Sequence, residues 1–143
     1  MSLYYENSPS AESSETKIFG LRKLDWSNSG AGDVNISKMA AGNNVVVAAT
    51  AACSVLRWKL DSSNNEEEIE ISRRPADKIA HLFVDPTGHH IIICLENGDH
   101  YYLHSRSSRP KKFSKSLHGN IESIAFDRDH GNESSTKSFL AGT

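Results

Sequence analysis

The sequence repeats itself with a period of 42 to 43 residues, and this repeat constrains the fold more than any other feature. Ile36 is followed by Ile79 and Ile121 at intervals of 43 and 42 residues. Two further sets of apolar positions keep the same intervals: Met39, Leu82 and Ile124, and Ala41, Val84 and Phe126. A period of about 40–45 residues that carries about four short strands is typical of a β-propeller blade. A β-sandwich, which also has short strands at regular spacing, is the alternative.

Within the first copy, short apolar runs alternate with turn residues and predict four strands. These strands are expected at Ile36–Ala41, Val45–Thr50, Ser54–Leu60 and Glu68–Ser72, with a polar loop at Asp61–Glu67. The third strand alternates strictly, so Leu56 and Trp58 are expected to face the core, together with Leu60. Arg57 and Lys59 are expected to face solvent.

The second and third copies follow the same order. Strands are expected at Ile79–Val84, His89–Leu95, Asp99–His104, Ile121–Phe126 and Ser138–Ala141. Asp85-Pro86-Thr87-Gly88 predicts a β-turn, and Asn97-Gly98 predicts a hairpin. The fold is therefore predicted to be all-β, with propeller blades at about 36–72 and 78–115 and a partial blade at about 120–143. The ring is incomplete, so we expect a truncated chain with open sheet edges that behaves poorly in isolation.

Residues 1–33 are expected to be a flexible tail and linker that precedes the partial propeller of residues 34–143. Asn7–Thr16 is rich in Ser and Glu and has no large apolar residue, so it cannot offset the entropy of ordering. A short apolar patch follows, formed by Ile18, Phe19, Leu21, Leu24 and Trp26. This patch is either a strand that joins the body or a docking segment.

Composition and charge exclude several classes of protein. The net charge is −2, which argues against a globally basic nucleic-acid binder, and the aromatic residues lie in strand contexts that suit core packing. No run of 18 apolar residues occurs, and no signal-peptide pattern is expected at the N-terminus. The two cysteines, Cys53 and Cys94, lie in apolar runs and are expected to be buried free thiols of a cytoplasmic protein.

Candidate catalytic and metal-binding residues do not form a recognisable site. The sequence has no G-x-S-x-G elbow and no phosphate-binding loop, so we expect no enzymatic activity and no cofactor. His100 and His104 share a face of a strand but lie about 13 Å apart, too far to bind one metal ion. His89 and His90 are expected to point to opposite faces.

A basic run between the second and third copies is the one candidate interaction site. Its basic residues are Arg106, Arg109, Lys111, Lys112 and Lys115. Such a run could contact an anionic surface such as lipid headgroups. The alternative is a solvated connection between blades, and Glu66–Glu68 is likewise expected to lie in a solvated loop.

Four segments carry a resemblance to a known family. Ile79–Leu95 (IAHLFVDPTGHHIIICL) resembles the N-terminal region of the vacuolar protein sorting-associated protein 18, or deep orange, family. Ile36–Thr50 is similar to its first blade motif, and Tyr101–Pro110 to its strand and loop before a basic Pro-containing turn. Glu133–Thr143 resembles its ESST…LxGT segment. The resemblance covers Ile36–Thr143, about three quarters of the chain, and departs at Phe126, where the family often has Trp.

The resemblance implies much that the residues alone do not. Members of the family carry an N-terminal β-propeller, an α-solenoid and a RING-type zinc domain, and the last two are absent from this sequence. They are subunits of the HOPS and CORVET tethering complexes in traffic from endosomes to lysosomes or vacuoles. The resemblance thus implies a non-catalytic scaffold whose partners are other subunits of such a complex, with SNARE or Rab machinery reached through the full-length protein. It also implies a cytoplasmic location, peripheral on late endosomal, lysosomal or vacuolar membranes. A propeller module of an unrelated regulatory complex is the alternative.

Overall fold

The computed structural model describes residues 19–21, 34–61, 65–113, 120–126 and 139–142. The chain divides into two compact units, Met1–Gly32 and Asp33–Thr143. In the first unit, residues 19–21 are not part of a strand, and the side chains of Phe19 and Leu21 are 89% and 82% exposed. Ile18, Leu24 and Trp26, the other members of the predicted apolar patch, lie outside the described residues.

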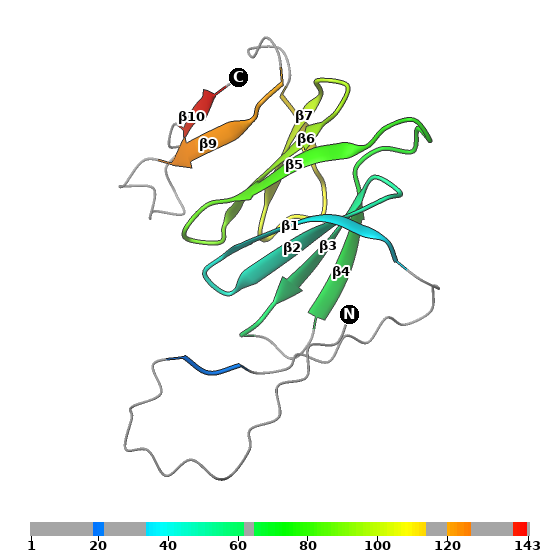
Figure 1. Ribbon diagram of the computed structural model, residues 1–143. Helices are drawn as coiled ribbons and strands as arrows, with labels where there is room; N and C mark the ends of the chain where they lie inside the picture. The colour runs from blue at the N-terminus through cyan, green and yellow to red at the C-terminus, as the bar shows by residue number, and fades with distance from the viewer. Residues whose placement is uncertain (1–18, 22–33, 62–64, 114–119, 127–138, 143) are drawn as a thin grey trace, which may run out of the picture. The chain divides into compact units, whose positions relative to one another are not determined.

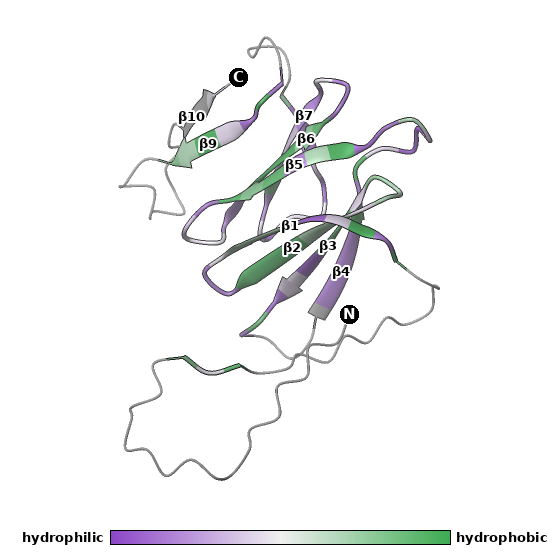
Figure 2. Ribbon diagram, in the orientation of Figure 1, coloured by the Kyte–Doolittle hydropathy of each residue, from purple (hydrophilic) through white to green (hydrophobic). Residues whose placement is uncertain are grey.

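The first sheet has four antiparallel strands in the order β1-β2-β3-β4 (Figure 1). The strands are β1 (Ile36–Gly42), β2 (Val45–Thr50), β3 (Ser54–Lys59) and β4 (Asn65–Glu70). β-Branched and apolar residues dominate β2 because both of its faces are covered, whereas β4 at the edge is mostly charged (Figure 2).

The second sheet repeats this topology in the order β5-β6-β7-β8. Its strands are β5 (Ile79–Val84), β6 (His90–Leu95), β7 (His100–His104) and β8 (Lys111–Lys112). A third sheet pairs β9 (Ser123–Phe126) with β10 (Phe139–Gly142). The described residues contain only strands and connections, and they include no helix suited to crossing a bilayer. The prediction of an all-β fold built from incomplete propeller blades is confirmed.

The repeat extends to an irregularity of the backbone. In β1 the pairing with β2 shifts by one residue between Ile36 and Lys38, and in β5 the pairing with β6 shifts between Ile79 and His81. The extra residues, Ser37 and Ala80, are 43 positions apart, so the same β-bulge occurs at the same place in both sheets. A bulge bends its strand and increases the local twist, and both sheets have one at the equivalent position.

An apolar cluster joins the first and second sheets, whose first strands β1 and β5 lie against each other. It contains residues of β2, β3 and β4 from the first sheet and Ile91, Ile93 and Leu95 from β6. The alternate residues of β6, Ile92 and Cys94, form a second cluster with Ile121 on the opposite face. β6 is therefore buried on both faces, and each fully buried isoleucine contributes about 1.5–3 kcal/mol to folding.

Gly42, the last residue of β1, lies against the backbone at the end of β5 in the second sheet. A Cβ atom at this position would overlap the backbone oxygen of Asp85 and the Val84 side chain. Gly88 has a positive φ of 76°, and a Cβ there would lie 2.6 Å from the Gly42 backbone oxygen. The contact between the sheets at this end is thus a backbone contact that only glycine permits.

The fourth strand of the first sheet begins earlier than predicted. The prediction of a polar loop at Asp61–Glu67 and a strand at Glu68–Ser72 is wrong, because β4 is Asn65–Glu70. Trp58 and Arg57 of β3 lie opposite Glu66 and Glu67, so Glu66–Glu68 belongs to a strand instead of a loop. Cross-strand pairing outweighs the low strand propensity of the glutamates here. Leu60 follows β3 and is exposed instead of facing the core.

Candidate interaction surface

The basic segment, residues 106–112, is part loop and part strand. Arg106, Arg109, Lys111 and Lys112 are all exposed, whereas Lys115 lies outside the described residues. The basic run is not a connection along its whole length, since Lys111 and Lys112 form β8 and pair with Tyr102 and Tyr101 of β7. This short strand gives the outer edge of β7 its hydrogen-bond partners.

The two lysines of β8 point to opposite faces of the second sheet because they are neighbours in a strand. The ammonium group of Lys112 lies 2.8 Å from Oδ2 of Asp99, and this hydrogen bond raises the pKa of Lys112. The basic residues therefore do not form a uniform patch, and at least one of them is compensated by a carboxylate.

Arg57 links the first sheet to the second. Its residue exposure is 2%, so the prediction that it faces solvent is wrong. One terminal nitrogen donates hydrogen bonds to the backbone oxygens of His104 and Ser107, at 3.1 and 3.0 Å. The other terminal nitrogen lies 2.5 Å from Oε2 of Glu67 on β4. Arg57 is buried because the neighbouring sheet and a carboxylate together supply acceptors for its charge.

Glu67 lies on the outward side of this link. Its second carboxylate oxygen accepts a hydrogen bond from the hydroxyl of Ser108, in the β7–β8 connection. Partial burial disfavours the charged form, but the hydrogen bonds from Ser108 and Arg57 outweigh this effect and lower the pKa of Glu67. We call Arg57, Glu67 and Ser108 the junction network, because it spans the outer parts of the first and second sheets.

Three histidines gather at the end of the β6–β7 pair. The ring centroid of His104 lies 6.1 Å from that of His89 and 5.6 Å from that of His90. The prediction that His89 and His90 point to opposite faces assumed that both belong to one strand, but β6 begins at His90 and His89 precedes it. The Nδ1 atoms of His89 and His90 lie 3.1 Å from the Ser105 hydroxyl and 2.8 Å from the Tyr102 hydroxyl.

The histidine cluster orients its surroundings and does not converge on a common point. Nδ1 of His104 accepts a hydrogen bond from the backbone N–H of Arg106 at 3.1 Å. The ring of His100, farther along β7, is fully buried and lies 6.0 Å from the ring of Phe113. No group of three His, Cys, Asp or Glu side chains within the described ranges is placed to hold a metal ion.

Asp85 fixes the turn between β5 and β6. Its carboxylate accepts hydrogen bonds from the backbone N–H of His90 at 2.9 Å and from the hydroxyl of Thr87 at 2.5 Å. The residue is fully buried. Burial disfavours the charged carboxylate, but the hydrogen bonds from Thr87 and His90 outweigh it and lower the pKa of Asp85. The aspartate is thus a structural anion of the turn.

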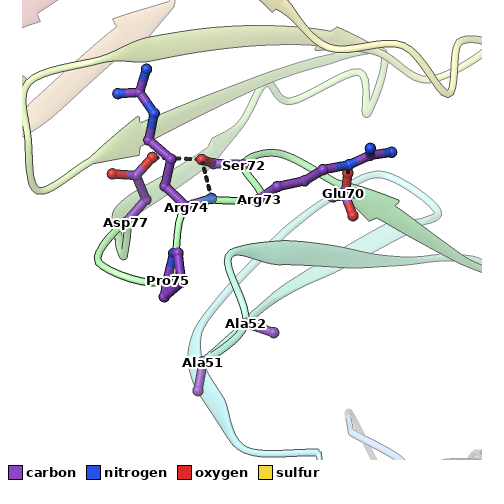
Figure 3. Close-up of a pocket in the computed structure, with 8 residues that line it drawn as sticks. All are labelled: Ala51, Ala52, Glu70, Ser72, Arg73, Arg74, Pro75 and Asp77. Carbon is purple, nitrogen blue, oxygen red and sulfur yellow. Dashed lines mark hydrogen bonds and ion pairs between the residues drawn. The ribbon is translucent and has the colours of Figure 1, made fainter.

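A groove of about 400 Å³ lies between the β2–β3 turn and the β4–β5 connection (Figure 3). Its floor is polar: the Ser72 hydroxyl donates to Asp77 at 2.5 Å and accepts from the backbone N–H of Arg74 at 3.2 Å. Arg73 forms an exposed ion pair with Glu70 at 2.6 Å. Small-molecule sites are mostly apolar and enclosed, so this open, charged groove suits a polar protein segment better.

Both cysteines are buried, as predicted. Burial raises the pKa of the Cys94 thiol to about 11. Burial, followed by the charge of Asp77, also raises the pKa of Cys53. Neither thiol has the lowered pKa of a nucleophile.

A sequence profile of the Pep3/Vps18/deep orange β-propeller domain matches residues 17–143. The two repeated four-stranded antiparallel sheets are typical of β-propeller blades. The match over almost the whole chain shows that it belongs to the vacuolar protein sorting-associated protein 18 family. The matched region begins at Lys17 and so includes the apolar patch, which the resemblance from Ile36 onward had missed.

Individual relatives agree with this assignment. A vacuolar protein sorting-associated protein 18 homolog of Danio rerio is 30% identical over 129 residues, which are 90% of this chain and 13% of that protein. Vacuolar sorting protein 18 of Arabidopsis thaliana is 30% identical over 112 residues, or 76% of this chain and 11% of the relative. A homolog from Drosophila melanogaster is 39% identical over 80 residues, 46% of this chain and 8% of that protein. The chain thus spans only a small part of the length of these relatives.

Proposed function

We propose that this chain is a non-catalytic scaffold segment of a HOPS/CORVET-type tethering subunit that acts in traffic from endosomes to lysosomes or vacuoles. The observation that carries the proposal is the match to the propeller domain over residues 17–143. The names of the relatives from Danio rerio and Arabidopsis thaliana, which refer to vacuolar sorting, support it. The same match favours this reading over a propeller module of an unrelated regulatory complex.

The physical contribution of such a segment is positional. Its sheets are cross-linked by an apolar cluster and by the junction network, which together give a rigid platform. The exposed outer strands and connections carry charges of both signs that other proteins can contact. Energy for membrane fusion comes from other components in this proposal.

The partners of the protein are, on this proposal, the other subunits of the tethering complex. SNARE or Rab machinery is reached through the full-length protein. The protein is cytoplasmic and associates peripherally with late endosomal, lysosomal or vacuolar membranes.

Affinity purification of the tagged protein from its own cells tests the proposal. We expect the other tethering subunits to co-purify and the protein to fractionate with lysosomal or vacuolar membranes. Ile91→Asp, which places a charge in the cluster between the sheets, should abolish both results, whereas Met39→Ala at an exposed position should not. Recovery of a different regulatory complex, with no tethering subunit, would contradict the proposal.

A further inference from the structure

Ser108 lies at the junction between the first and second sheets and is exposed. Its hydroxyl donates to the carboxylate of Glu67 on β4, although the two residues are 41 positions apart in the sequence. Ser108 therefore has an accessible hydroxyl, and a chemical change at this hydroxyl alters a contact between two blades.

The buried positive charge at this junction, that of Arg57, already has its hydrogen-bond acceptors. Arg57 donates to two backbone oxygens through one terminal nitrogen and to Glu67 through the other. Its side chain is almost completely buried, so it cannot reorient toward a new anion without giving up one of these acceptors. A second negative group beside Glu67 would compete with that carboxylate for the buried guanidinium of Arg57.

The sequence around Ser108 also suits modification. Arg106 and Arg109 flank the serine two residues before and one residue after it, and both are exposed. Basic side chains on either side of an exposed serine complement the acidic substrate grooves of basophilic protein kinases. Ser107 is less suited, because its backbone oxygen holds Arg57 and its hydroxyl accepts a hydrogen bond from the backbone N–H of Arg109.

We propose that Ser108 is a phosphorylation site and that its phosphorylation loosens the outer part of the junction between the two sheets. In the modification, Oγ of Ser108 attacks the γ-phosphorus of ATP bound to a basophilic serine/threonine kinase. The bond between that phosphorus and ADP breaks, ADP leaves, and the hydroxyl proton passes to the carboxylate base of the kinase.

The product changes the charge balance of the junction network. A phosphoserine carries about −1.5 to −2 charges at pH 7, so a strong anion replaces a hydrogen-bond donor beside Glu67. The carboxylate and the phosphate then repel each other while sharing Arg57. The apolar cluster between the sheets contains none of these three residues, so the expected result is a local opening of the β7–β8 connection and not global unfolding.

Limited trypsin digestion of the full chain measures this opening, since trypsin cleaves after Arg106 but not between Arg109 and Pro110. Ser108→Asp is expected to increase the rate of cleavage after Arg106 by about tenfold, and Ser108→Ala, which removes only the hydrogen bond, by at most about threefold. Equal rates for the two variants would overturn the proposed effect of charge.

A double variant separates repulsion from a general loss of structure. In a Glu67→Gln background the new carboxylate of Ser108→Asp is the only one left to pair with Arg57. Adding Ser108→Asp to this background should therefore slow the cleavage instead of accelerating it. Acceleration in both backgrounds would mean that the substitution damages the connection without any charge competition.

Peptide mapping by mass spectrometry tests the modification itself. We expect protein purified from its own cells with phosphatase inhibitors to carry phosphate on Ser108, and phosphatase treatment to restore slow cleavage after Arg106. A Ser108 that is wholly unmodified in that protein would overturn the assignment. Neither readout depends on membership of a tethering complex, so the proposal stands or falls separately from the proposed function.

Discussion

The first and second sheets share a topology and a β-bulge but differ at their outermost strands. Both run in simple order from the first strand to the fourth, with the extra residue at the same position of the repeat. The fourth strand of the first sheet, β4, has six residues and is acidic. The fourth strand of the second sheet, β8, has two residues, both lysines.

This difference separates two ways of holding blades together. Toward the first strands, contacts between the sheets are apolar or, at Gly42, backbone to backbone. Toward the fourth strands, a single buried arginine and its partners join the sheets. Apolar side chains and backbone atoms thus form one part of the junction, and individual charged residues form the other.

The largest effect on stability is expected from a cavity in the apolar part of the junction between the two sheets. Ile91→Ala should lower the free energy of unfolding by about 3–4 kcal/mol, because the side chain is fully buried between the sheets. Urea denaturation followed by tryptophan fluorescence measures the change. Met39→Ala is the control, since Met39 is 62% exposed and should cost less than about 0.5 kcal/mol. Similar losses for both variants would mean that the cluster does not carry the stability.

A smaller loss of stability is expected from a substitution in the polar part of the junction. Arg57→Met keeps the aliphatic stem but removes the donor to the backbone oxygens of His104 and Ser107 and one of the two donors to Glu67. We expect a loss of about 2 kcal/mol, since Glu67 is partly exposed and water can replace some of these contacts. Lys59→Met removes a positive charge from the same face of β3 and is the matched control. A loss for Arg57→Met no greater than for the control would show that the junction network contributes nothing.

The fold was largely predictable because apolar periodicity reports burial. The three equivalent isoleucines begin β1, begin β5 and lie two residues before β9, so the repeat marks the start of each sheet. The same periodicity failed for Arg57, because alternation predicts which side of a strand a residue faces but not whether a second sheet covers that side. The sequence signal for the burial of Arg57 was Glu67, which lies opposite it in the neighbouring strand.

Cross-strand register was harder to predict than the strands themselves. Asn97-Gly98 correctly indicates a hairpin, but Leu95 pairs with Asp99 through a hydrogen bond of 2.8 Å, which makes the connection three residues long. A two-residue connection would have moved His104 away from its position opposite His90. The histidine cluster thus depends on one residue of loop length, which composition and spacing do not specify.

A still smaller effect on stability is expected at the turn between β5 and β6, which Asp85 stabilises. Asp85→Asn should cost about 1 kcal/mol at pH 7, because the anion accepts its hydrogen bonds more strongly than an amide oxygen does. Folding lowers the pKa of Asp85, so its contribution is complete above the unfolded value of about 3.9 and is lost as pH falls through the folded value. The difference between the urea midpoints at pH 7 should therefore shrink as the pH falls below about 3.9. A constant difference would contradict a charged Asp85, and exposed Asp61→Asn is the control.

The smallest effect is expected from substitutions in the basic run of the second sheet, and it concerns membrane binding instead of stability. The variant carries Arg109→Ala, Lys111→Ala, Lys112→Ala and Lys115→Ala. Each uncompensated basic side chain near an anionic leaflet strengthens binding roughly fivefold, so four of them would give a large difference in flotation with phosphatidylserine vesicles. We expect parent and variant to float equally even at low salt, because Asp99 already pairs with Lys112 and Glu67 lies beside the loop that carries Arg109. A loss of flotation in the variant, reversed in the parent by added salt, would show instead that the segment binds anionic membranes.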